Sequence, residues 1–174
     1  MYYVDDFITA KELISINNTQ KNWGMMDYIH YYASIGNETY IKLEQLCKKY
    51  DAIPLKAITA AINKTLINER IIKSGDIEIE DKDFEEGDKC LEYLNNIRKN
   101  IKVHITTPAS FFLLLAKTYY LEGIDRIKLY HAVITKYGTE NYGSSLQCAM
   151  AIEHWYNFKS RTYRYISNEI LPRR

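Results

Sequence analysis

The sequence predicts a mainly α-helical protein, and three observations support this fold class. Apolar residues recur three and four residues apart, at helical spacing, in most segments of the 174-residue chain. Thr9 with Glu12 and Ser144 with Gln147 form capping boxes, which are typical of helix starts. Strand-like patterns are confined to a short N-terminal stretch and to residues around 71–80, where a small β-hairpin is expected.

Residues 1–70 are expected to form the first region of the chain. Residues 1–4 suit a short strand, and the first capping box begins a helix that runs to about Asn17. A second helix is predicted within residues 24–35, and Gly36 ends it as a C-cap. These elements precede the best-defined helices of this region.

Two further helices follow with only three residues between them. The first starts after Asn37, and the second starts at Pro54, which suits the first turn of a helix. Such a pair is either an ordinary helical hairpin or a helix-turn-helix, whose second helix reads DNA. In the latter case the second helix would present four polar side chains outward: Lys56, Thr59, Asn63 and Lys64. The hairpin is the default interpretation, because short helix pairs are common and the turn lacks glycine.

Residues 71–88 are expected to form an acidic connector or the β-hairpin. The stretch 76–88 holds eight acidic residues against one lysine. A solvated linker explains this composition, although such a segment could also mimic nucleic-acid phosphates and occupy a basic groove on a partner. Residues 89–174 are expected to form a helical C-terminal region, with predicted helices that include 108–121 and 124–136.

Charge and hydropathy restrict the classes of partner. Lys and Arg total 23 against 22 Asp and Glu, so the net charge gives no reason to expect nucleic acid or an anionic membrane, and any basic surface must be local. No apolar run is long enough to span a membrane and the first residues do not resemble a signal sequence, so a cytoplasmic protein is expected. The three cysteines are far apart and are predicted to be buried thiols.

No complete set of catalytic or metal-binding groups is visible in the sequence. The four histidines have no metal-ligand spacing, and the chain has no phosphate-binding glycine loop or nucleophile elbow. We therefore expect no cofactor, no metal and no self-contained active site. A nuclease that assembles distant groups, such as His30 with Tyr31 and Lys21, stays open as the alternative.

The C-terminal segment combines aromatic and basic residues. In the run 155–165, aromatic residues alternate with Lys159, Arg161 and Arg164, and from position 154 onward five Lys or Arg stand against one Glu. Aromatic rings stack on unpaired bases while cations contact phosphates, which is typical of a surface for single strands or RNA. The alternative is that the aromatic residues pack in the core and the arginines are solvated.

Two segments near the ends of the chain carry distinctive motifs. The first holds a polar box, continued over residues 27–33, that consists of Asn17, Asn18, Gln20, Lys21 and Trp23. The second is the segment 152–159, with its tyrosine-asparagine-aromatic-lysine pattern. Both segments resemble those of phage and prophage proteins with a ParB-like nuclease-type domain, and the resemblance implies the ParB/sulfiredoxin superfamily and a bacterial host cell as the setting.

The sequence departs from this family in two respects. Family members place a mixed sheet with an arginine-containing phosphate motif before the polar box, and this chain lacks that N-terminal chemical half. Asn17 also stands where nucleotide-binding relatives have a glutamate that helps to hold a metal ion, so the charge that a hard cation prefers is missing. The resemblance therefore implies binding rather than catalysis.

The leading hypothesis is a non-catalytic nucleic-acid-binding protein of a phage or mobile element. Backbone contacts would come from Lys48, Lys49, Lys56 and Lys64, a base-edge contact from Asn63, and a second positive patch from Lys159, Arg161 and Arg164. The alternative is an inhibitor of a host defence system of the CRISPR type, which acts through protein contacts or on guide RNA. The expected partner is thus DNA or RNA, the alternative partner is a host defence nuclease complex, and a homo-oligomer stays open.

Overall fold

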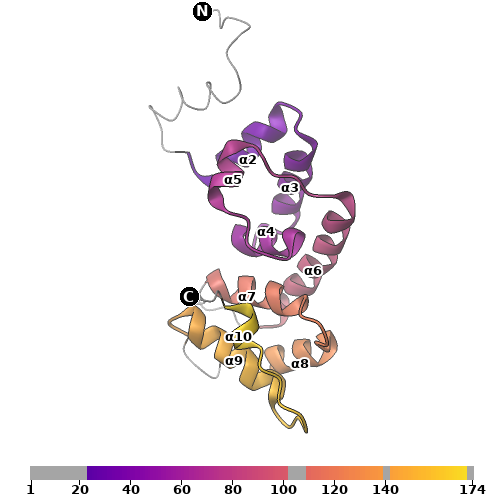
Figure 1. Cartoon of the computed structure of the whole chain (residues 1–174), viewed down its shortest axis with the longest axis vertical. Coiled ribbons are helices and arrows are strands. Elements are labelled where there is room, and N and C mark those ends of the chain that lie inside the picture. The colour runs from indigo at the N-terminus through magenta and orange to yellow at the C-terminus, as the bar shows by residue number, and fades with distance from the viewer. Residues whose placement is uncertain (1–22, 102–108, 139–141, 172–174) are drawn as a thin grey trace, which may run out of the picture. The chain divides into compact units, whose positions relative to one another are not determined.

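The computed structural model describes residues 23–101, 109–138 and 142–171 (Figure 1). Within these ranges the regular secondary structure consists of nine helices, α2 to α10, and no strands. The prediction of a mainly helical protein is confirmed for this part of the chain. The short strand expected at residues 1–4 lies outside the described residues. No helix of the described ranges is both long and apolar enough to cross a membrane.

The helices fall into two compact units that are interleaved along the chain. Unit 1 comprises the described residues up to Glu44 together with Asn68–Glu78, and unit 2 comprises Gln45–Ile67 with the described residues from Ile79 onward. The chain therefore passes from one unit to the other three times. These boundaries differ from the expected regions 1–70, 71–88 and 89–174, because residues 45–67 pack with helices that follow residue 79.

Unit 1 contains α2 (Met25–Ser34), the first part of α3 (Glu38–Lys49) and α5 (Glu69–Ser74). Two buried tyrosines hold α5 in place by hydrogen bonds to its backbone. The Tyr40 hydroxyl donates to the carbonyl oxygen of Ile72 at 2.9 Å, and the Tyr32 hydroxyl donates to that of Lys73 at 3.1 Å. Burial raises the pKa of both hydroxyls, so they remain donors at neutral pH.

The β-hairpin expected around 71–80 is wrong. Residues up to Ser74 belong to α5, whose N-cap Asn68 accepts a hydrogen bond from the backbone N–H of Arg70 at 2.9 Å. Gly75 ends this helix with a φ of 80°, which glycine adopts at little cost. A Cβ at Gly75 would also lie 2.4 Å from Cε1 of Tyr32. The Ser74-Gly75 pair is therefore a helix end rather than a hairpin turn.

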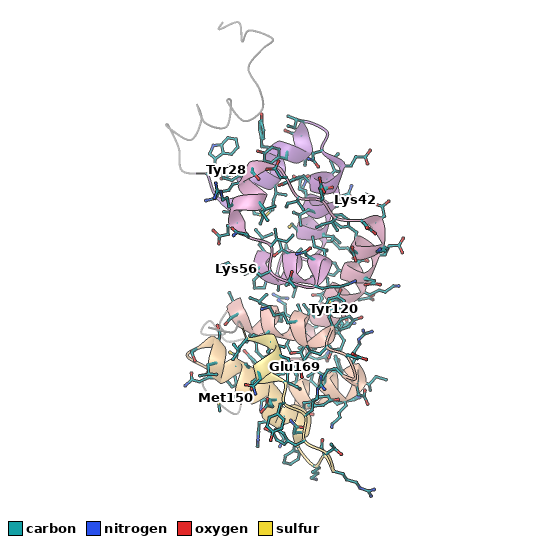
Figure 2. The ribbon with its side chains drawn as sticks, viewed as in Figure 1. Tyr28, Lys42, Lys56, Tyr120, Met150 and Glu169 are labelled. Carbon is teal, nitrogen blue, oxygen red and sulfur yellow. The ribbon has the colours of Figure 1, made fainter. Side chains whose placement is uncertain are left out.

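Unit 2 is built around α4 (Leu55–Asn63), which packs against α6 (Asp81–Asn100) and α7 (Ala109–Tyr119). The helices α4 and α6 approach so closely at Gly87 that a Cβ there would lie 2.5 Å from Cγ2 and 2.9 Å from Cα of Ile62. Tyr120, directly after α7, donates from its hydroxyl to the carbonyl oxygen of Ala61 at 2.6 Å (Figure 2). This contact joins α7 to α4.

The remaining helices of unit 2 are α8 (Arg126–Lys136), α9 (Ser145–Asn157) and the short α10 (Ser167–Ile170). α9 packs against α7, α8 and α10 (Figure 1). Its N-cap is Ser144, as the capping box predicts, and its hydroxyl accepts from the N–H of Gln147 at 3.2 Å. An aromatic core around Trp155 holds α7 and α9 together.

The three cysteines are buried thiols, as predicted: Cys47, Cys90 and Cys148. Burial raises the pKa of Cys90 to about 12 and that of Cys148 to about 11. Both thiols are therefore protonated at neutral pH and poor nucleophiles.

The acidic stretch is not a connector over its whole length. Residues from Asp81 onward form the first turns of α6, where carboxylates interact favourably with the positive end of the helix dipole. Phe84, Gly87 and Leu91 of the same helix are buried in unit 2. The acidic residues between them are therefore held on the surface of a packed helix.

Candidate nucleic-acid interface

The lysines expected to contact DNA near α3 and α4 are largely neutralised by α6. Lys49 forms an ion pair with Asp88 at 2.7 Å, and Lys64 pairs with Asp83 at 3.1 Å and with Glu86 at 2.9 Å. Hydrogen bonds to these carboxylates raise the pKa of both lysines. Each of these cations thus lies beside at least one carboxylate of its own protein.

The other predicted contacts of this region are Lys48, Lys56 and Asn63. Lys48 and Lys56 are exposed. The Asn63 side-chain amide donates to Oγ1 of Thr65 at 3.0 Å, which engages the donor expected to reach a base edge.

The helix α4 is a core helix. Thr59, expected to point outward, is 0% exposed, and its hydroxyl donates to the carbonyl oxygen of Lys56 at 3.1 Å. All six residues from Ala57 to Ile62 are buried against neighbouring helices of unit 2. A recognition helix needs an exposed face to enter the major groove, and α4 does not offer one. The burial of α4 therefore argues against the helix-turn-helix interpretation, and the hairpin stays a prediction.

The polar box of the ParB resemblance is described only at its last residue. Asn17, Asn18, Gln20 and Lys21 lie outside the described residues. The ring of Trp23 is half-buried and lies 5.3 Å from that of Tyr28 and 5.6 Å from that of Tyr31 between centroids. Trp23 thus belongs to the aromatic cluster of unit 1.

The loop that follows α9, residues 158–166, is held in one conformation by Asn157. Its side-chain oxygen accepts from the N–H of Arg164 at 2.7 Å, and its amide donates to the carbonyl oxygen of the same residue at 2.7 Å. At the start of the loop, the N–H of Ser160 donates to the carbonyl oxygen of Asn157 at 2.9 Å, with Lys159 at a φ of 58°. Both parts of the loop are therefore tied to Asn157, Ser160 through its backbone carbonyl and Arg164 through its side chain.

Glu153 also holds this loop in place, by hydrogen bonds to Tyr163 and Ser167. Its largely buried carboxylate accepts hydrogen bonds from the Tyr163 hydroxyl at 2.7 Å and from the N–H and hydroxyl of Ser167, each at 2.8 Å. Burial alone would raise the pKa of Glu153, but these hydrogen bonds outweigh it and hold the pKa below its usual value. Glu153 is therefore charged at neutral pH, and its charge is fully engaged inside the protein.

The outer side of the loop presents aromatic and basic side chains. Tyr163 and Tyr165 are 53% and 64% exposed, and their ring centroids lie 4.9 Å apart. Lys159 and Arg161, two of the three predicted cations of this patch, are also exposed. Arg164 is not available in the same way, because its guanidinium pairs with Glu169 at 2.9 Å and donates to the carbonyl oxygen of Glu122.

A pocket of about 330 Å³ lies beside this loop, between α8 and the end of α9. Its walls include Lys128, His131, Thr135 and Lys136 of α8, with Trp155 and Phe158 opposite, and none of the described residues that line it is a carboxylate. The Nζ of Lys136 lies 4.1 Å from the ring centroid of Phe158, which is 48% exposed. Lys128 lies 4.3 Å from the ring centroid of Tyr156 and donates a short hydrogen bond to Oγ of Ser160.

The α8 residues of this pocket were missed in the sequence. Lys128, His131, Thr135 and Lys136 recur at helical spacing, so one polar and basic face of a helix over 126–136 could have been predicted. Their position beside Phe158 could not, because it depends on how α8 packs against α9. The N–H of Asp125, the N-cap of α8, donates to the Tyr156 hydroxyl at 3.1 Å and helps to set this packing.

Metal chemistry receives no support from the described ranges, in which no three His, Cys, Asp or Glu residues come together as a metal site. No protein-family model, curated protein or solved structure matches this chain. The resemblance to ParB-like phage proteins therefore stays a prediction from the sequence, and the function has to be inferred from the chemistry of the surface itself.

Proposed function

We propose that this protein binds single-stranded nucleic acid, without cleaving it, through a basic-aromatic surface of unit 2. This surface consists of the loop residues 158–165 and the pocket between α8 and α9. The observation that supports the proposal most is the exposed pair Tyr163 and Tyr165, carried with Lys159 and Arg161 on a loop whose backbone is already fixed.

The fixed loop favours binding because little conformational entropy remains to be lost. Exposed tyrosine rings stack on unpaired bases of any sequence, and neighbouring cations contact the phosphates between them. Asn157 and Glu153 hold the loop backbone and the Tyr163 side chain before any ligand arrives. A surface ordered in advance binds more tightly than one that must be ordered by its ligand.

The aromatic side chains favour single strands over duplexes. In a duplex the base faces are covered by neighbouring base pairs, so a protein ring has nothing to stack on unless a base is extruded. Duplex readout normally uses a helix in the major groove, and the α3–α4 pair offers no such helix because α4 is buried. We therefore expect duplex DNA to bind more weakly than a single strand of the same length.

Phe158 can join the surface although Lys136 lies over its ring at 4.1 Å. A cation–π contact at an exposed site is worth about 0.5–1 kcal/mol. Stacking of one base on an aromatic side chain is worth about 1–3 kcal/mol. A base can thus replace the lysine on the ring, and the displaced lysine can then contact a phosphate.

The test is fluorescence anisotropy with labelled single-stranded DNA, single-stranded RNA and duplex DNA, at low and moderate salt, followed by analysis of each oligonucleotide for cleavage. We expect single strands to bind, to remain intact and to dissociate as salt rises. Tyr165→Ala should weaken binding about tenfold, whereas Tyr165→Phe, which keeps the ring, should bind like the natural protein. Equal binding by the two variants would contradict stacking, and cleavage would restore the nuclease alternative.

A second candidate is the inhibitor of a host defence system, acting through protein contacts. The observation that favours it is a pair of exposed apolar side chains one turn apart on α9, Leu146 and Met150, at 55% and 56% exposure. The acidic stretch supports this candidate less, because Asp83, Glu86 and Asp88 are paired with lysines of the same protein. Absence of binding to every oligonucleotide would favour this candidate over the first.

A further inference from the structure

The pocket between α8 and α9 has the size of a site for one small ligand. Its volume of about 330 Å³ is at the lower end of the range for ligand pockets, which suits a single nucleotide. The walls come from two different helices, so the pocket is separate from the exposed tyrosine pair. Its proximity to the tyrosine loop follows from Phe158 and Ser160, which belong to that loop and contact α8 through Lys136 and Lys128.

The lining of the pocket combines the two kinds of group that recognise a nucleotide. Phe158 offers a partly exposed ring, and Trp155 lines the interior. Lys128 and Lys136 are eight residues apart on α8, which places their backbones about 12 Å apart along the helix axis. Among the described residues, no carboxylate lines the space between them, so these walls offer a phosphate cations and neutral groups.

We propose that this pocket binds one nucleotide of the bound strand, whose base is unstacked from the neighbouring bases; this inference rests on the proposed function. Its base lies against Phe158, and its phosphates lie between Lys136 and Lys128. The Thr135 hydroxyl and His131 supply hydrogen-bonding groups in the same walls. The pocket thus binds one nucleotide by its base and its phosphate together, whereas the loop stacks on neighbouring bases through Tyr163 and Tyr165 and contacts their phosphates through Lys159 and Arg161.

Trp155 provides a direct measurement of this binding. The chain has two tryptophans, so in a Trp23→Phe background the tryptophan fluorescence, excited selectively over the tyrosines, comes from Trp155 alone, within the pocket lining. The probes are adenosine 5′-monophosphate, ribose 5-phosphate, which has no base, and inorganic phosphate. We expect the mononucleotide to change the fluorescence of Trp155 saturably, and each of the other two probes to bind at least tenfold more weakly.

Variants separate the two recognition elements. Phe158→Ala and Lys136→Ala should each weaken mononucleotide binding about tenfold, while Phe158→Tyr, which keeps a ring, should retain it. Lys89→Ala, an exposed lysine on α6 that does not line the pocket, is the matched charge control and should have no effect. Circular dichroism of each variant distinguishes loss of a contact from loss of the fold.

The outcomes distinguish this inference from the function on which it rests. A Trp155 signal that is unchanged by the mononucleotide, or equally strong with ribose 5-phosphate, overturns the pocket inference. If labelled single strands still bind in that case, and Tyr165→Ala still weakens their binding, the proposed function stands without the pocket inference. If neither single strands nor the mononucleotide bind, both are wrong. Saturable binding that requires Phe158 and Lys136 supports the inference.

Discussion

Two groups of cations in unit 2 were predicted to contact nucleic acid, and they differ in what surrounds them. Near α3 and α4, Lys49 and Lys64 lie within ion-pair distance of carboxylates on α6. On the loop after α9, Lys159 and Arg161 are exposed beside aromatic rings. A basic stretch in a sequence therefore becomes a basic surface only where the fold brings no carboxylates to it.

The largest expected effect concerns the packing that places carboxylates beside Lys64. Gly87→Ala introduces a Cβ into the backbone of α4, where Ile62 has no room to move, and should lower the free energy of unfolding by about 1–3 kcal/mol. Urea unfolding measures this change. Gly143→Ala is the control, because its Cβ would meet only the end of the Gln147 side chain at 3.3 Å. An equal loss in both variants would contradict a special role for the close approach at Gly87.

The charges of the two groups can be compared directly by salt titration. Removing Lys159 and Arg161 together should weaken single-strand binding about tenfold and reduce the salt slope by about 1.4, since each phosphate contact on a single strand contributes about 0.7. Removing Lys49 and Lys64 together should leave the slope unchanged. A larger change from the second pair would reverse the comparison and return the site to the α3–α4 region.

The hydrogen bonds beneath the loop should influence both stability and loop order. Glu153→Gln removes a charged acceptor of three hydrogen bonds and should lower the free energy of unfolding by about 1 kcal/mol. Trypsin should then cleave faster after Lys159 and Arg161, as followed by mass spectrometry. Unchanged cleavage would mean that Asn157 alone holds the loop.

The same carboxylate predicts a pH dependence with a definite sign. Because the pKa of Glu153 is lowered by folding, its contribution is complete above the pKa of an unfolded glutamate, about 4.3, and is lost as the pH falls through the lower folded value. Urea unfolding should therefore show a loss of stability in acid that is smaller in Glu153→Gln. An identical acid dependence in both proteins would exclude this contribution.

The smallest expected effect concerns one surface ion pair. Asp88→Asn removes the partner of Lys49, and exposed pairs of this kind contribute less than about 1 kcal/mol to stability. The freed lysine should increase single-strand binding at low salt by less than about threefold, and the increase should vanish at moderate salt. A large increase would show that α6 masks a second nucleic-acid surface.

Local signals in the sequence predicted much of the helical fold. Ser144 caps α9 as expected, and Gly36, predicted to end the helix within residues 24–35, has a positive φ. The error at residues 71–80 arose because a Ser-Gly pair ends a helix as readily as it turns a hairpin. The choice between them depends on Tyr32 and Tyr40, which hold α5 from far away in the sequence.

The candidate site could be predicted only in part, because half of it depends on tertiary packing. Lys159 and Arg161 were identified from local composition, and the structure places them on an exposed loop. Arg164 was assigned to the same patch, but its partner Glu169 could not be inferred from spacing alone. The α8 wall of the pocket is separated from Phe158 by more than twenty residues of chain, and no local pattern joins them.

The interleaving of the two units has a consequence for how the protein is made on the ribosome. Unit 1 lacks its second segment until residue 78 has been synthesised, and residues 45–67 emerge before α6, which covers α4. Neither unit can therefore complete its core before synthesis of the other unit has begun, although domains commonly fold one after another during synthesis. A chain that ends before residue 79 would hold α4 without α6 and α7, which cover it, so such fragments should be aggregation-prone.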